Sequence, residues 1–211
     1  MPLWRPGKAV QAERSTERLP PGQRRVGGWP VLHEGAVPLF DPQTWRLRIW
    51  GACAHELSLD WEQLQALPQR ETVQDFHCVT TWSRYDNRWG GVGIGSLLEL
   101  AGPLPQARFA LVHSYDGVGY TTNLPLNDLA RPDNLVALHH DGAPLSPEHG
   151  GPVRLVVHHL YAWKSCKWLA GIELLPADHR GYWEERGYHN QADPWREQRY
   201  SYQEEGAEGE G

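Results

Sequence analysis

The chain has 211 residues, of which 40% are hydrophobic and 22% are charged, and its formal net charge is −6. A chain of this length can form one domain with tails and bury a core without disulfides or metal ions. The negative charge argues against a general nucleic-acid binder, which is usually basic. No apolar run approaches the ~18 residues that a membrane span needs.

Three cysteines, Cys53, Cys78 and Cys166, are far apart in the sequence and form no Cys-x-x-Cys pair. An odd number of separated cysteines is more typical of a reducing compartment than of a secreted protein. No apolar stretch follows the first charged residues, so the pattern of a secretory signal is not present. We therefore expect a cytoplasmic protein without a membrane span.

Composition divides the chain into three parts. Residues 1–26 are polar and rich in Arg, Glu and Pro, so a mobile N-terminal arm is expected there. The domain itself is expected over residues 27–176, which carry the patterns of regular secondary structure. Residues 177–211 form a C-terminal extension, whose Trp- and Tyr-rich part is expected to pack by aromatic contacts. A disordered acidic end is expected at Glu204, Glu205, Glu208 and Glu210.

The predicted elements are mostly strands. Alternation of apolar and charged residues over 45–51 indicates a strand with one buried face. Asp60 and Gln63 have the spacing of a capping box and begin a short helix, which Pro68 ends. The glycine-rich run 90–95 is expected to be flexible and to allow backbones to approach closely. Further strands are predicted at 72–79, 108–114, 120–124, 134–140, 153–160 and 168–175, and a short helix at 96–101.

These elements decide the fold class. Strands outnumber helices and follow one another through short turns, with short helices between some of them. This order predicts an α+β fold with mixed or mainly antiparallel sheets.

Cys78 is the first candidate for chemistry, because it lies at the end of the predicted strand 72–79. A thiolate is a preferred ligand of soft metals and, when its pKa is lowered, a strong nucleophile. His77 is adjacent, but neighbours on a strand point to opposite faces, so the adjacency does not imply a Cys–His pair. Inert burial is the commonest role of a lone cysteine at such a position. The residue alone does not decide between these roles.

A second group of polar residues flanks the apolar stretch 153–160. His149 and Arg154 lie at its start, and the guanidinium of Arg154 has the planar shape that suits a phosphate. The bend 164–167 follows it and contains two lysines, where backbone N–H groups can add donors. The residues alone leave two interpretations open, an anion-binding site and a solvated basic turn.

Two segments, in this order, resemble those of the sulfite oxidase family. The cysteine segment runs from 77 to 83 and continues with Trp89-Gly90-Gly91-Val92. The second pterin segment runs from 149 to 157 and continues from 163 to 168. The resemblance covers about residues 27–176. The chain resembles a small, single-domain, bacterial-type member of this family. Its core is similar to that of the catalytic subunit of methionine-sulfoxide reductases.

The resemblance implies a molybdopterin-binding domain of the sulfite oxidase type and a molybdenum-bound pyranopterin. The sequence departs from the better-known relatives in having no haem motif, so no haem is expected. It implies two-electron oxygen-atom transfer on a small substrate such as sulfite, a sulfoxide or an N-oxide, with an unknown protein as electron donor or acceptor. Cys78 would be the metal ligand, and Arg84 and Arg88 are candidates for substrate binding. The implied cofactor contacts are His33, Glu34, Ser114, His149, Arg154, Ser165, Cys166 and Lys167.

Two alternatives belong to other classes. The first is a non-catalytic domain that binds molybdopterin or has kept the fold as a scaffold. The second is an enzyme that uses Cys78 as a nucleophile without a metal, in which case the thiol of the isolated protein would react readily with alkylating reagents.

Overall fold

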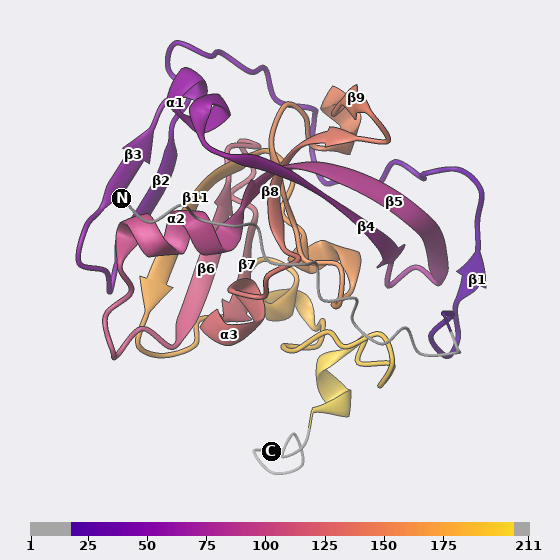
Figure 1. The fold of residues 1–211 in the computed structure, drawn as a ribbon. Coiled ribbons are helices and arrows are strands. Elements are labelled where there is room, and N and C mark those ends of the chain that lie inside the picture. The colour runs from indigo at the N-terminus through magenta and orange to yellow at the C-terminus, as the bar shows by residue number, and fades with distance from the viewer. Residues whose placement is uncertain (1–17, 205–211) are drawn as a thin grey trace, which may run out of the picture.

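Residues 18–204 are described in a computed structural model, and they form two β-sheets with short helices between them (Figure 1). The first sheet has the strand order β1 (Arg24–Arg25), β5 (Trp82–Gly93), β8 (Leu135–His140) and β10 (Arg154–Val156), with β4 (Gln69–His77) beside β5 and β9 (Ala143–Pro144) beside β8. The second sheet has the order β3 (Leu57–Leu59), β2 (Leu47–Gly51), β11 (Leu169–Leu175), β6 (Phe109–Ser114) and β7 (Thr121–Pro125).

Most neighbouring strands are antiparallel, and the parallel pairs are β1 with β5 and β2 with β11. The helices are short: α1 (Trp61–Ala66), α2 (Ile94–Ala101), α3 (Leu126–Leu129) and the 3-10 turns η1 (Pro147–His149), η2 (Ala162–Lys164), η3 (Glu184–Arg186) and η4 (Ser201–Gln203). The predicted α+β class with mixed, mainly antiparallel sheets is therefore confirmed.

The predicted capping box is present at the start of α1. Asp60 Oδ1 accepts a hydrogen bond of 2.8 Å from the Gln63 backbone N–H, and Gln63 Oε1 accepts one of 3.0 Å from the Asp60 N–H. The helix ends at Ala66, two residues before Pro68. These two bonds satisfy backbone donors that the first turn of a helix leaves without partners.

Strand β5 is the main departure from the prediction, which assigned no strand to residues 82–93. It is 12 residues long and pairs with β4, β8 and β1. Its polar residues interrupt the alternation, and its glycines are poor strand formers, so its pairing comes from the strands on either side. Gly91 shows the predicted close approach, because a Cβ there would lie 2.1 Å from the Val136 carbonyl oxygen.

The largest apolar cluster contains residues from both sheets and from α2. Burial of each such aliphatic side chain contributes about 1.5–3 kcal/mol. Its members with no exposed surface include Leu47, Ile49, Val92, Leu97, Val112, Val136, Leu155 and Ile172.

The first described residues, 18–26, lie on the first sheet, where a mobile arm was predicted. Strand β1 pairs with the start of β5, and Arg18 Nη2 forms ion pairs of 2.6 and 2.7 Å with Asp75 and Asp86. The amide of Gln23 donates a hydrogen bond of 3.0 Å to the Cys78 carbonyl oxygen. Residues 1–17 of the predicted arm lie outside the described residues.

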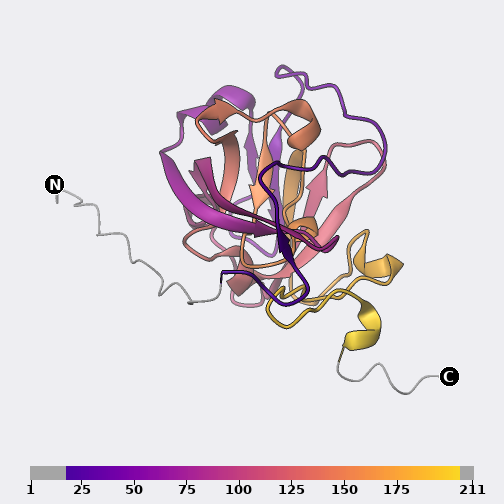
Figure 2. The same ribbon diagram turned by 90° about the vertical axis from the view of Figure 1, so that its right-hand side faces the viewer.

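The C-terminal extension follows β11 and lies at one end of the two sheets (Figures 1 and 2, yellow). Its aromatic rings contact one another as expected: the ring centroids of Trp183 and Tyr188 are 5.0 Å apart, and those of Tyr188 and Tyr200 are 5.9 Å apart. Glu204 accepts hydrogen bonds from the Asn190 N–H and from Arg180. The other residues of the predicted acidic end lie outside the described part of the chain.

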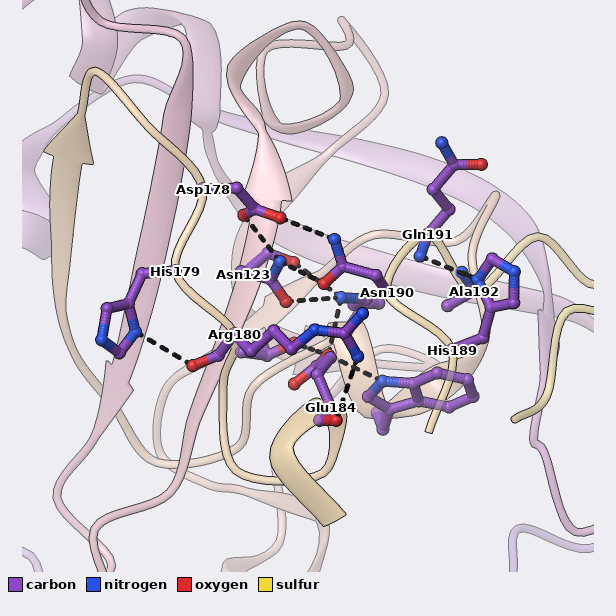
Figure 3. Close-up of polar contacts among 12 residues, drawn as sticks. Asn123, Asp178, His179, Arg180, Glu184, His189, Asn190, Gln191 and Ala192 are labelled. Carbon is purple, nitrogen blue, oxygen red and sulfur yellow. Dashed lines mark hydrogen bonds and ion pairs between the residues drawn. The ribbon is translucent and has the colours of Figure 1, made fainter. Parts of the chain in front are cut away.

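A fully buried ion pair joins this extension to η2. Lys164 Nζ lies 2.6 Å from Glu184 Oε1, and neither side chain has exposed surface. The same carboxylate oxygen accepts hydrogen bonds of 2.9 Å from Thr122 Oγ1 and from Trp163 Nε1. Asn123 of β7 accepts two bonds from Lys164 Nζ, at 2.8 and 2.9 Å, and its amide donates to Asp178 and Asn190 (Figure 3). Each buried charge therefore has partners on more than one segment.

Two histidines, His77 buried and His140 half-buried, lie at the ends of two strands that both pair with β5 in the first sheet. His77 ends β4, and its Nδ1 lies 2.8 Å from Ser83 Oγ. His140 ends β8, and its Nε2 lies 3.0 Å from Arg84 Nη1. Burial lowers the pKa of each ring to about 4, and the positive charge of Arg84 adds to the effect at His140.

Substitution Glu184→Ala is expected to lower the free energy of unfolding by about 3–5 kcal/mol, because it leaves the Lys164 ammonium buried without its partner. Urea unfolding measures this change. Glu185→Ala, at an exposed neighbouring position, is the control and should change stability by less than about 0.5 kcal/mol. Equal stability of the two variants would contradict the role given to the ion pair.

The histidine pKa values predict acid sensitivity. An unfolded histidine has a pKa of about 6.5, so between pH 6.5 and pH 4 the unfolded chain binds more protons at His77 than the folded one. The folded state therefore has its full stability above pH 6.5, where His77 is neutral in both states. As the pH falls from 6.5 to 4, the free energy of unfolding decreases by up to about 3 kcal/mol. Urea titrations at pH 4.5 and 7 should show a smaller pH dependence for His77→Asn than for wild type; an unchanged dependence would refute the assignment.

Candidate active site

A cavity of about 290 Å³ lies where the two sheets, the loop 29–34 and the C-terminal extension meet. Its wall contains Cys78, which directly follows β4, and Arg154, which begins β10. Further predicted site residues in this wall are His33, Glu34, Ser114, Ser165 and Lys167. The fold therefore brings into one cavity residues that are far apart in the sequence.

The turn after β4 holds Cys78 through its backbone. The Cys78 N–H donates to the Trp82 carbonyl oxygen at 2.8 Å, and its own carbonyl oxygen accepts from the Thr81 N–H and the Gln23 amide at 3.1 and 3.0 Å. The residue is 8% exposed, and its Sγ lies 3.2 Å from Thr80 Oγ1. Backbone bonds thus fix Cys78 at the cavity wall, and its sulfur has Thr80 Oγ1 as a polar neighbour.

The environment of the sulfur favours the neutral thiol. Burial raises the pKa of Cys78 above its ordinary value, and the Thr80 hydrogen bond and the positive charges of Lys167 and Arg199 only partly oppose this effect. A buried thiol with a raised pKa is a poor nucleophile. A bound metal cation would change this balance, because coordination deprotonates a thiol.

Arg154 is the buried cation of the cavity. Its Nη1 donates to the His149 carbonyl oxygen and its Nη2 to that of Ser165, both at 2.8 Å. Its guanidinium carbon lies 5.5 Å from the ring centre of Phe76 and 5.7 Å from that of Trp29. Burial lowers the pKa of Arg154 to about 10, so the group stays charged at neutral pH.

Lys167 is the second cation of the wall. Its Nζ donates to the carbonyl oxygens of Glu148 and Leu32, at 2.7 and 2.8 Å. Burial, followed by the charge of Arg154, lowers the pKa of Lys167 to about 7. A negatively charged group in the cavity would stabilise its protonated form.

The other predicted residues of the wall have local partners. Ser165 Oγ accepts from the Val157 N–H at 2.9 Å, and Ser114 Oγ, at the end of β6, accepts from the Asp116 N–H at 3.1 Å. The His33 ring lies edge-on to Trp168, with centroids 5.2 Å apart.

Two of the predicted cofactor contacts lie behind the wall. The His149 ring stacks on Trp29, with centroids 3.9 Å apart, and its Nε2 lies 3.1 Å from the Trp29 carbonyl oxygen. Cys166 has no exposed surface and belongs to the apolar core, where its thiol donates to the Lys167 carbonyl oxygen at 3.3 Å. Each of them contacts a residue of the wall.

Arg84 and Arg88, the candidates for substrate binding, lie outside the cavity wall. Arg84 Nη2 is 2.5 Å from Asp141 Oδ2, and Arg88 Nη1 is 3.8 Å from Glu71 Oε2. Both belong to β5, and their closeness to Cys78 in the sequence does not bring them to it in space, because the chain turns at residues 78–81.

The aromatic part of the wall was not predicted from the sequence. Trp29, Tyr120, Trp163, Trp183 and Tyr188 all contribute to it. The signal was the unusual count of 11 Trp, but composition does not say which indoles face a cavity. Tyr188 and Trp183 come from the C-terminal extension, whose position depends on tertiary contacts.

Within residues 18–204, no three or more His, Cys, Asp or Glu side chains are grouped so that they could hold a metal ion. No helix among the same residues is both long enough and apolar enough to cross a membrane.

Known proteins are similar to this chain in sequence. The domain family described as "Oxidoreductase molybdopterin binding domain" matches residues 34–183. The "Uncharacterized oxidoreductase YuiH" of Bacillus subtilis (strain 168) is 44% identical over 197 residues, which are 93% of this chain and 98% of that protein. The protein-methionine-sulfoxide reductase catalytic subunit MsrP of Campylobacter jejuni is 30% identical over 161 residues, covering 69% of this chain and 54% of that protein.

Among solved structures, the sulfane dehydrogenase SoxCD from Paracoccus pantotrophus matches with a TM-score of 0.63 and 22% identity, over 69% of this chain and 41% of that chain. This likeness concerns the fold. The chain spans about half the length of MsrP, whereas the family match covers most of the chain. The chain belongs to the sulfite oxidase family of oxidoreductases with a molybdopterin-binding domain.

Proposed function

We propose that this enzyme binds a molybdenum pyranopterin in the cavity and transfers an oxygen atom to or from a small substrate of the sulfite, sulfoxide or N-oxide type. The observation that carries the proposal is the meeting of one thiol, Cys78, with two cations, Arg154 and Lys167, in one cavity wall. When bound, such a cofactor supplies a two-electron couple and the oxygen-transfer chemistry, while the protein binds and orients it.

The donors of the cavity fit the phosphate of such a cofactor. A guanidinium has five N–H donors, and Arg154 uses three of its nitrogen atoms on the carbonyl oxygens of Leu155, His149 and Ser165. Lys167 has three donors and uses two on carbonyl oxygens. Each side chain is therefore positioned by the protein and keeps donors for an anion.

The proposed roles follow from these positions. Cys78 would be the metal ligand, since it supplies a soft sulfur at the wall. Arg154 and Lys167 would bind the phosphate, and His33, Glu34, Ser114 and Ser165 would be the other contacts. His149 and Cys166 would act indirectly, through Trp29 and Lys167, and the proposal gives no substrate contact to Arg84 or Arg88.

The compartment and the electron partner of the enzyme are also part of the proposal. We propose a cytoplasmic protein without haem that exchanges electrons with a separate protein. Its three free cysteines support a reducing compartment. A non-catalytic carrier of the cofactor is the second candidate, and the family comparison favours an enzyme. A metal-free cysteine nucleophile is disfavoured by the raised pKa of Cys78.

Substitution Cys78→Ser is expected to abolish turnover while the protein stays folded, because the hydroxyl is a poor replacement for a soft ligand and the turn is held through its backbone. Oxide reduction with an artificial electron donor, elemental analysis and circular dichroism measure these properties. Cys53→Ser, outside the cavity wall, is the control. Full molybdenum content together with full activity in Cys78→Ser would refute the assignment.

Substitution Arg154→Ala is expected to speed the loss of the cofactor about ten- to hundred-fold, because it removes charge-assisted hydrogen bonds of about 1.5–3 kcal/mol. Pterin content after dialysis measures this loss. Arg154→Lys keeps a positive charge without the planar guanidinium, so its rate of cofactor loss should lie between those of wild type and Arg154→Ala. Arg108→Ala, at an exposed position, is the control, and unchanged pterin retention in Arg154→Ala would count against the phosphate site.

A further inference from the structure

Three aromatic rings of the cavity wall, Trp163, Trp183 and Tyr188, form a group that we call the aromatic wall. Val79, the residue after Cys78, packs against the same apolar cluster as these rings. The Tyr188 ring centre is 5.2 Å from that of Trp163 and 5.0 Å from that of Trp183. The rings therefore pack against one another in the same cavity wall that contains Cys78.

The aromatic wall is held rigidly by the buried ion pair. Trp163 Nε1 donates to Glu184 Oε1 at 2.9 Å, and Glu184 directly follows Trp183 in the chain. The Tyr188 N–H donates to the Trp183 carbonyl oxygen at 3.0 Å, and Tyr188 also forms a β-bridge with Tyr200. A surface fixed in advance loses little conformational entropy when a ligand binds to it.

The positively charged side chains near the aromatic wall already have other partners or proposed roles. Arg154 and Lys167 are the residues proposed to bind the phosphate, and His33 lies beside Trp168. Arg199 is close to the Cys78 turn, but it donates to the Val79 carbonyl oxygen at 2.6 Å and is not part of the cavity wall.

Negatively charged residues of the wall also disfavour an anionic substrate. Glu34 and Asp116 lie in the same cavity wall. Of these two, Glu34 acts on Tyr188: burial is the largest cause that raises the pKa of Tyr188, followed by Tyr200, Cys78 and Glu34. An oxyanion that entered beside Tyr188 would lose its hydration without gaining a new cation among the described residues, and such a loss is costly.

Building on the proposed function, we propose that the aromatic wall binds the organic group of the substrate. It would select an uncharged sulfoxide or N-oxide that carries an apolar or aromatic group, in preference to an oxyanion such as sulfite. Trp183 and Tyr188 would be the specificity-determining residues, and both are supplied by the C-terminal extension.

The test compares methyl phenyl sulfoxide with dimethyl sulfoxide in the molybdenum-loaded enzyme. Reduction of either one breaks its S–O bond, consumes two electrons and two protons, and releases the sulfide and water; two molecules of reduced viologen dye supply the electrons. We expect wild type to favour the phenyl compound in kcat/KM, and Trp183→Ala to reduce this preference about ten-fold, mainly through KM. Trp195→Ala is the matched control, because Trp195 belongs to the same extension but is 41% exposed and outside the wall.

A binding measurement gives a second readout that does not depend on turnover. Isothermal titration calorimetry with methyl phenyl sulfone, dimethyl sulfone and sulfate should give the tightest binding for the phenyl sulfone in wild type and Trp195→Ala. Tyr188→Phe, which keeps the ring, should retain this order, and Trp183→Ala should lose it. Equal binding of the two sulfones, tighter binding of sulfate, or equal behaviour of the two Trp variants would overturn the inference.

The two proposals fail in different ways. If the purified protein holds no molybdenum or reduces neither sulfoxide, the proposed function is wrong and the inference falls with it. If dimethyl sulfoxide is reduced and Trp183→Ala leaves the preference for the phenyl compound unchanged, only the aromatic wall is wrong.

Discussion

The position of one turn, residues 78–81, determines the geometry of the cavity. One adjacent residue and two distant ones hold it: Trp82 at the start of β5 accepts from the Cys78 N–H, Gln23 donates to the Cys78 carbonyl oxygen, and Arg199 donates to that of Val79. The N-terminal segment and the C-terminal extension thus meet at the sulfur. Because backbone bonds fix the turn, the position of the sulfur does not depend on its own contact with Thr80 Oγ1.

The second constraint is the burial of charge. Arg154 and Lys164 are both almost fully buried, and each is surrounded by oxygen atoms that offset part of the cost of leaving water. Arg154 is bound by carbonyl oxygens, which do not neutralise its positive charge, and this charge suits the proposed phosphate. Lys164 is already neutralised by Glu184 and serves to join the extension to the domain. The two cations are close in the sequence, but their partners give them different roles.

Local patterns in the sequence predicted much of the fold. Alternation found β2, and the Asp60–Gln63 spacing found α1, because in both cases the deciding forces act between near neighbours. Strand β5 was missed because its polar and glycine residues are stabilised by the strands beside it. For the site, the motif positions of Cys78, Arg154 and Lys167 led to one cavity. Trp183 and Tyr188 were out of reach, since a buried ion pair that no local pattern signals brings them to the wall.

The central claim is that Cys78 places a protein sulfur on a cofactor metal whose phosphate lies at Arg154 and Lys167. Molybdenum-edge X-ray absorption of the purified enzyme tests it most directly. The account predicts that the spectrum of Cys78→Ser lacks a sulfur neighbour that wild type and Cys166→Ser both show. A wild-type protein without molybdenum, or the same sulfur coordination in wild type and Cys78→Ser, would contradict it.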